Sequence, residues 1–105
     1  MSTLNGDAAK WRALRPEVQA MARAMENRLR ANDHKGGWMD EDSASLLLRL
    51  DEEADELSDA TVAVLMDEAP PSLVLKEAAD VCNFAMMVAD VSGALATPQA
   101  GGEVV

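Results

Sequence analysis

Residues 46 to 57 read LLLRLDEEADEL, and this stretch decides the fold because its apolar positions follow the period of an α-helix. These positions recur at spacings of four, four and three residues, which places them on one helix face. They are Leu46, Leu50, Ala54 and Leu57. Five acids stand between Leu50 and Leu57. Dense acidic runs usually form a solvated helix face, so the question is whether some of these carboxylates turn toward the core.

The acids of this stretch divide by helix face. At about 100° per residue, Glu53 lies about 60° from Leu50, at the edge of the leucine stripe, and Glu56 lies about 60° farther round. Glu52 is nearly opposite the stripe, and the two aspartates lie on the other side. Glu53 and Glu56 are therefore neighbours on a flank that borders the core.

A second helical stretch, KEAADVCNFAMMVAD at residues 76 to 90, repeats this arrangement. Its polar flank begins beside Lys76 and contains Glu77, Asp80, Asn83 and Met87. If the two helices pack antiparallel, their paired carboxylates meet. Four clustered negative charges repel one another strongly and need a cation.

Carboxylate oxygens are hard ligands that suit Mg²⁺ or Mn²⁺. The sequence contains one histidine and one cysteine, so no cluster of softer ligands competes. A single Mg²⁺ usually takes one or two carboxylates and keeps several waters, so four carboxylates suggest more than one ion, completed by substrate phosphates.

The rest of the chain also predicts helices, giving an all-α bundle of four helices with a short third helix. An apolar stripe from Leu14 to Leu29, with Pro16 suited to a first turn, predicts a helix over residues 16 to 31, and residues 8 to 14 add a helical lead-in. The polar stretch NDHKGGWMDEDS, residues 32 to 43, predicts a loop.

Local signals set the expected helix ends. Ser43 or Ser45 is expected to cap the second helix, and Ser58 with Asp59 to break it. Residues 61 to 68 then form the short third helix or, because they are rich in β-branched residues, a strand. After Pro70 and Pro71, Ser72 is expected to cap a last helix over residues 73 to 95, whose apolar face is Val74, Ala78, Val81, Ala85 and Val88. Residues 1 to 7 and 96 to 105 are expected to be disordered, so the folded domain spans residues 8 to 95.

Composition limits the classes of partner. The chain has 105 residues, 49% of them hydrophobic, and only three aromatic side chains, which favours one helical domain. The net charge of −10 argues against binding to nucleic acid or to anionic membranes. Residues 1 to 35 carry a balance of +3 and the remainder −13. The lone Cys82 and the absence of a long apolar run predict a soluble, cytoplasmic protein.

Taken together, the motif E-E-x-x-E at residues 52 to 56 and the motif E-x-x-D at residues 77 to 80 resemble the metal-binding signature of the MazG-like all-α nucleoside triphosphate pyrophosphohydrolases. The likeness spans about residues 20 to 92. The stretches DHKGGW and EAADVCNFAMMVAD are similar to short, single-domain members encoded by bacteriophages, which would place the protein in the host cytoplasm.

The resemblance implies an Mg²⁺-dependent enzyme that cleaves a nucleoside triphosphate between its α- and β-phosphates, releasing a nucleoside monophosphate and pyrophosphate. It implies four metal ligands: Glu53, Glu56, Glu77 and Asp80. Glu52 would lie next to these ligands without binding the metal itself, or help to polarise the attacking water. Glu53 is the second carboxylate that is expected to have a catalytic role. The phage members suggest a guanine nucleotide, dGTP or GTP, as substrate.

Five further residues are candidates for binding the substrate. Lys35 and Lys76 can contact the β- and γ-phosphates, and each is otherwise a surface lysine. Trp38 can stack on the base or cover the end of the bundle. Asn83 can bind sugar, base or the metal cluster, or else fix a backbone, and His34 can reach a phosphate or order its loop.

A small protomer cannot easily enclose a nucleotide, and the resemblance implies association as a homodimer or tetramer. The basic first helix is then a source of residues from a neighbouring chain. Three other functions remain open on the sequence. They are a phosphoribosyl-ATP pyrophosphohydrolase, a nucleotide sensor without turnover and a non-catalytic acidic interaction module.

Overall fold

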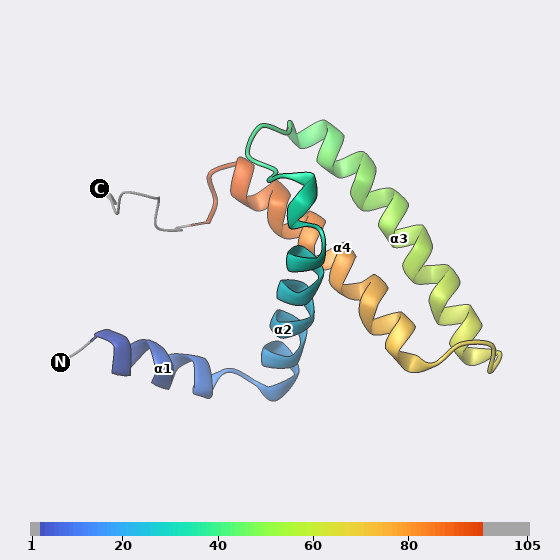
Figure 1. Cartoon of the computed structure of the whole chain (residues 1–105), viewed down its shortest axis with the longest axis horizontal. Helices are drawn as coiled ribbons and strands as arrows, with labels where there is room; N and C mark the ends of the chain where they lie inside the picture. The colour runs from blue at the N-terminus through green and yellow to red at the C-terminus, as the bar shows by residue number, and fades with distance from the viewer. Residues whose placement is uncertain (1–2, 96–105) are drawn as a thin grey trace.

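The computed structural model describes residues 3 to 95, with side chains from residue 6 onward, and this part of the chain is helical without any strand (Figure 1). The expected all-α class is therefore confirmed, and the strand alternative for residues 61 to 68 is wrong. The elements are α1 (Thr3–Ala13), α2 (Pro16–Ala31), the 3₁₀ turn η1 (Asp33–Lys35), α3 (Ser43–Leu65) and α4 (Pro71–Val91). The predicted disordered tail, residues 96 to 105, lies outside the described residues.

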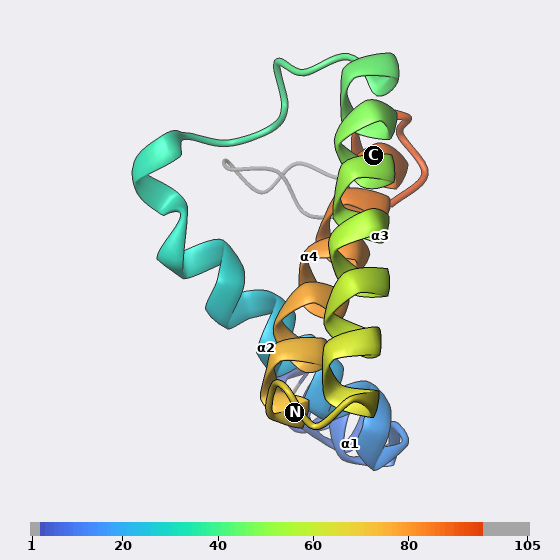
Figure 2. The same cartoon turned by 90° about the vertical axis from the view of Figure 1, so that its right-hand side faces the viewer.

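Helices α3 and α4 form an antiparallel hairpin, and α2 packs across α4 (Figures 1 and 2). The turn between α3 and α4 spans residues 66 to 70. The long connection from η1 to α3 carries the chain from the end of α2 to the end of the hairpin opposite the α3–α4 turn (Figure 2). This arrangement puts the acidic flanks of α3 and α4 beside the basic end of α2.

Helix α3 continues to Leu65, so the predicted break at Ser58 and Asp59 and the separate helix over residues 61 to 68 are wrong. The fourth helix is instead α1. Ala60 is only 4% exposed, which shows that the packing of α3 continues past the expected break. The Thr61 hydroxyl donates a hydrogen bond to the Leu57 carbonyl at 2.8 Å, which satisfies the hydroxyl within the helix. Packing outweighs the weak local preference of Ser, Asp and Thr for ending a helix.

The N-cap residues of α3 and α4 are not the serines that the sequence predicts. At α3 the cap is Asp42, whose carboxylate accepts a hydrogen bond from the Ser45 backbone N–H at 2.7 Å and whose pKa is lowered by that bond. Helix α4 begins at Pro71, and its N-cap residue, Pro70, is extended and makes no side-chain cap bond. Because proline has its φ preset for a first turn, Pro71 starts the helix one residue before the predicted cap, Ser72.

Helix α4 is the central element, and its most buried residues differ from the predicted face. Ala79 is fully buried and Asn83 is 3% exposed, whereas Ala85, which we expect in the core, is exposed. The reason is that α4 contacts both α2 and α3, so the flank that carries Asn83 is enclosed from two sides. The small Ala79 side chain permits close approach of the neighbouring helices.

Helix α1 extends away from the other helices and is joined to α2 at an elbow (Figure 1). It begins at Thr3, within the segment that the sequence predicts to be disordered. Two interactions hold the elbow. The Gln19 side chain donates to the carbonyls of Trp11 at 2.9 Å and Leu14 at 3.0 Å, and the Arg23 guanidinium lies 5.5 Å from the centre of the Trp11 ring.

The protomer buries little apolar surface. Among residues 6 to 95, the buried hydrophobic side chains are Leu46, Ala60 and Ala79. Large apolar side chains are exposed at the end of α3, where Leu65 is 79% and Met66 is 65% exposed. The radius of gyration is 16.1 Å, whereas a compact domain of this length has about 13 Å. Within residues 3 to 95, no helix combines the length and apolarity needed to cross a membrane.

Candidate metal and nucleotide site

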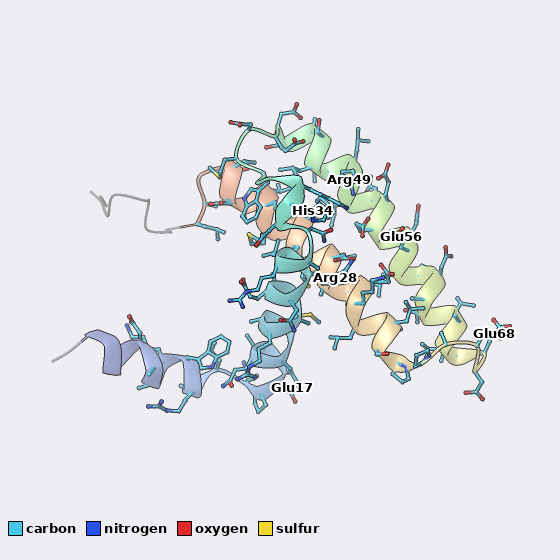
Figure 3. All side chains as sticks on the ribbon, in the orientation of Figure 1. Glu17, Arg28, His34, Arg49, Glu56 and Glu68 are labelled. Carbon is cyan, nitrogen blue, oxygen red and sulfur yellow. The ribbon has the colours of Figure 1, made fainter. Side chains whose placement is uncertain are left out.

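Three carboxylates converge where α3 packs on α4. Glu53 and Glu56 come from α3 and Glu77 from α4, and each offers an oxygen that lies within 4.8 Å of the others. The spacing of three residues on α3 puts Glu53 and Glu56 on one flank, as the sequence predicts, and the antiparallel packing brings Glu77 opposite them. We call these three residues the glutamate triad. Figure 3 marks Glu56 on α3, beside the place where α2 crosses α4.

Asp80, the fourth predicted ligand, lies at the same site but is held by a cation from α2. The Arg28 guanidinium donates two parallel hydrogen bonds to it, from Nε to Oδ1 at 2.9 Å and from Nη2 to Oδ2 at 3.2 Å. The Asp80 side chain is 13% exposed and that of Arg28 is 30% exposed. The structure thus places all four predicted carboxylates in one region but gives Asp80 a partner of the protein's own.

Crowding of these acids changes the chemistry of Glu53. Partial burial raises the pKa of Glu53 to about 7, and its hydrogen bond with Glu56 and the charges of Glu56 and Asp80 act in the same direction. Arg49 opposes the rise through its positive charge. Near neutral pH, the Glu53 carboxyl is therefore only partly ionised.

The triad opens into a cleft of about 580 Å³ between α2, α3, α4 and the loop after α2. Polar and apolar side chains both line it. From the predicted substrate-binding set, the lining includes Lys35, Trp38, Lys76 and Asn83. This volume is in the range of pockets that hold small ligands. The two lysines, together with Arg28 and Arg49, bring positive charge to a lining that also contains the four predicted carboxylates.

Trp38 is anchored at the edge of this cleft. Its indole Nε1 donates to Asp90 Oδ2 at 3.0 Å, which links the loop to the end of α4. The indole is half-buried and its side chain lines the cleft. The anchoring bond fixes the ring without using its faces, so both proposed roles, a base platform and a cover for the bundle end, are compatible with this position.

Asn83 joins α4 to α2 and carries an unpaired acceptor. Its Nδ2 donates to the Met25 carbonyl at 3.0 Å, whereas its Oδ1 is buried and has no hydrogen-bond partner among the described residues. An orphaned buried acceptor costs about 1–3 kcal/mol, so such groups are few. The hydrogen bond to Met25 gives Asn83 the backbone-fixing role that was one of its two predicted roles. Its Oδ1 is an unused acceptor of a residue that lines the cleft.

Two predicted residues are not brought into the cleft. His34 lies exposed in η1 and is not part of the cleft lining (Figure 3). Glu52 is also outside the lining and instead pairs with Arg49 at 3.1 Å on the surface of α3. Because Glu52 is nearly opposite the leucine stripe, it can influence the site only through Arg49. The predicted role of Glu52 in polarising the attacking water stays a prediction.

Sequence reasoning missed Arg28, the cation closest to the predicted ligands. A signal existed, because Arg28 is three residues after Met25 and one before Leu29, which places it on the edge of the apolar stripe. We expected basic residues of the first helix to serve a neighbouring chain, whereas Arg28 contacts Asp80 of its own chain. Arg49, on α3, also lies over the Phe84 ring, with its guanidinium carbon 4.9 Å from the ring centre.

The donor set fits a hard divalent cation. Three carboxylates with oxygens within 4.8 Å of each other can share one ion. The lining residues of the cleft include no thiolate or imidazole ligand that would favour zinc. Mg²⁺ or Mn²⁺ is the type of ion that these residues would hold.

The pKa of Glu53 predicts how stability depends on pH. Between about 4.5 and 7 the folded protein holds a proton that the unfolded chain has released, so the free energy of unfolding falls as the pH rises through this range. With EDTA present, we expect the thermal midpoint to fall from pH 5 to pH 8. Glu53→Gln should reduce this fall, and Glu52→Gln should not. An equal fall in all three proteins would contradict the assignment.

No protein-family model, no curated protein and no solved structure matches the chain.

Proposed function

We propose that this protein is a nucleoside triphosphate pyrophosphohydrolase that depends on Mg²⁺ or Mn²⁺. The observation that supports the proposal most strongly is the glutamate triad, which two antiparallel helices assemble beside a cleft lined by lysines. The products would be a nucleoside monophosphate and pyrophosphate. The resemblance of the two acidic motifs to the MazG-like enzymes supports the same activity.

Within this proposal each group of residues has a role. The triad would hold the ion, and when bound the ion would neutralise the polyphosphate and lower the pKa of a water. Of the two glutamates expected to be catalytic, only Glu53 lines the cleft, so we assign to it the acceptance of a proton from the attacking water. The water oxygen would bond to the α-phosphorus as the bond to the bridging oxygen breaks, and pyrophosphate would leave.

The other lining residues would position the substrate. Lys35 and Lys76 come from different elements, η1 and α4, and would contact the β- and γ-phosphates as point charges. Trp38, held by Asp90, would stack on the base. A guanine nucleotide is our first choice of substrate, on the resemblance to the phage enzymes.

The test is turnover by the full chain with Mg²⁺ and each of the eight common nucleoside triphosphates, with phosphoribosyl-ATP as a ninth substrate. Detection of both pyrophosphate and monophosphate is the expected result. Reactions in ¹⁸O-labelled water should put the label in the monophosphate, because water attacks the α-phosphorus. Label in pyrophosphate, release of inorganic phosphate alone or an absence of turnover with every substrate would contradict the proposal.

We also propose that the active form is a homodimer or tetramer. The small buried core, the large radius of gyration and the apolar cluster at the end of α3 support this, since isolated globular proteins rarely expose contiguous apolar surface. This cluster consists of Val62, Leu65 and Met66, which are 55%, 79% and 65% exposed.

Light scattering after gel filtration should give a mass of at least twice the protomer's 11.2 kDa. Leu65→Asp should shift the mass toward the protomer, because a charge in an apolar interface loses its water without gaining a partner. Met39→Asp, which changes a 61% exposed residue in the loop before α3, is the matched control and should leave the mass unchanged. Wild-type protein at the protomer mass would refute the proposed assembly.

A further inference from the structure

The Arg28–Asp80 pair joins α2 to the polar flank of α4. Its geometry is a two-pronged contact, with both carboxylate oxygens used, at 2.9 and 3.2 Å. Charge-assisted pairs of this shape are among the stronger hydrogen-bonded contacts in proteins. The pair is also partly withdrawn from water, because the Asp80 side chain is 13% exposed. It is therefore a defined contact and not a mobile surface ion pair.

Arg28 is surrounded by the acids of the site. Its hydrogen bond with Asp80 raises its pKa, and the charges of Asp80, Glu77 and Glu53 act in the same direction. The guanidinium also lines the cleft that the triad opens into. Arg28 thus supplies one positive charge to the same group of carboxylates that would hold a divalent ion.

A divalent ion and Arg28 would compete for these carboxylates. If Asp80 joined the triad in binding an ion, its carboxylate oxygens could no longer all accept hydrogen bonds from the Arg28 guanidinium. The ion and the guanidinium would also repel each other. A triphosphate beside the ion removes this conflict, because its oxygens can accept the guanidinium instead. The planar guanidinium fits two phosphate oxygens as well as it fits two carboxylate oxygens.

We propose that Arg28 is a phosphate-positioning residue that holds Asp80 when the cleft is empty and transfers to a phosphate of the substrate when the metal and nucleotide bind. This inference rests on the proposed function and adds a residue and a sequence of events to it. In the free protein Arg28 keeps Asp80 from repelling the triad. In the complex, Arg28 releases Asp80, which then binds the metal. From its position on α2, the guanidinium neutralises part of the negative charge of the substrate.

The proposal predicts opposite changes in two affinities when Arg28 is replaced by Met in the full chain. Without nucleotide, Mn²⁺ should bind at least about two- to fivefold more tightly, because a cation that competes for the carboxylates is lost. With Mn²⁺ present, the α,β-imido analogue of dGTP should bind about 10- to 100-fold more weakly, as expected for loss of charged hydrogen bonds worth about 1.5–3 kcal/mol. Electron paramagnetic resonance measures free Mn²⁺, and calorimetry measures the analogue.

Arg30→Met is the matched control, because Arg30 lies on the same helix and pairs with Glu26 on the exposed surface at 2.8 Å. It changes the net charge equally and should alter neither affinity. Arg28→Lys retains the charge without the two-pronged shape, so it should weaken analogue binding less than Arg28→Met. If Arg28→Met does not fold, Arg28→Lys carries the test and must still weaken analogue binding relative to wild type.

The outcomes separate this inference from the proposed function. Weaker binding of both Mn²⁺ and the analogue would show that Arg28 only supports Asp80, and an unchanged analogue affinity would show that it does not contact phosphate; either result overturns the inference. Wild-type protein that binds no Mn²⁺, or binds it equally after Glu53→Gln, would instead overturn the metal site itself.

Discussion

Glu53→Gln should lower the rate of Mg²⁺-dependent pyrophosphate release by at least about a hundredfold. The substitution keeps the shape of the side chain but removes a negative charge from the triad, whose members lie within 4.8 Å of one another. Stabilisation of the reacting phosphate by a bound metal is worth several kcal/mol, and about 2.7 kcal/mol corresponds to a hundredfold in rate. Glu77→Gln, on the other helix, should produce a loss of the same size, because both helices supply one site.

The double variant Glu53→Gln with Glu77→Gln should lose little more than either single variant, since groups that act as a unit are not additive. Asp51→Asn and Asp55→Asn are matched controls that neutralise exposed acids on the same helix outside the cleft. They should retain activity near that of wild type. Initial rates from released pyrophosphate at several Mg²⁺ concentrations check these expectations, and full activity in Glu53→Gln would remove the triad from the mechanism.

Asn83→Asp is expected to reduce the free energy of unfolding by at least about 3 kcal/mol at pH 8, because a buried charge without a partner is strongly unfavourable. The new carboxylate would replace the donor that now bonds the Met25 carbonyl and would add a negative charge to a buried position where Oδ1 already lacks a partner. Asp80, one helical turn earlier, would oppose it further. Urea unfolding in EDTA measures the loss.

The pH dependence gives a second readout for Asn83→Asp. Burial raises the pKa of a carboxyl, so the loss should grow as the pH rises above about 4, where the unfolded chain ionises, and shrink in acid. Asn27→Asp makes the same change at an exposed position on α2 and should alter stability by no more than about 0.5 kcal/mol. Equal stability of the two variants would mean that Asn83 is not buried as described.

Helical periodicity predicted the parts of the site that belong to a single helix. The flank with Glu53 and Glu56, and the flank with Glu77 and Asp80, could be read from the sequence because residues three apart are neighbours on any α-helix. The same reasoning placed α2 at residues 16 to 31, in agreement with its observed bounds. The place of Arg28 on the edge of the apolar stripe could have been read in the same way, but spacing along one helix does not indicate which helix that edge faces.

Predictions that depended on weak local preferences were wrong. Ser58 and Asp59 do not end α3, because the packing that buries Ala60 extends the helix past them. The start of α3 is set by Asp42, which competes with two neighbouring serines of similar capping strength. Capping preferences differ by fractions of a kcal/mol, whereas packing of a helix face contributes more.

The sequence by itself determined the helical class and the acidic flanks, because both follow from spacing along one element. Only the tertiary structure decided that Glu53, Glu56 and Glu77 meet, that Asp80 is held by Arg28 and that Glu52 and His34 stand outside the cleft. The physical reason is that a helix fixes the direction of its own side chains, whereas the partner that each side chain meets depends on how separate helices pack.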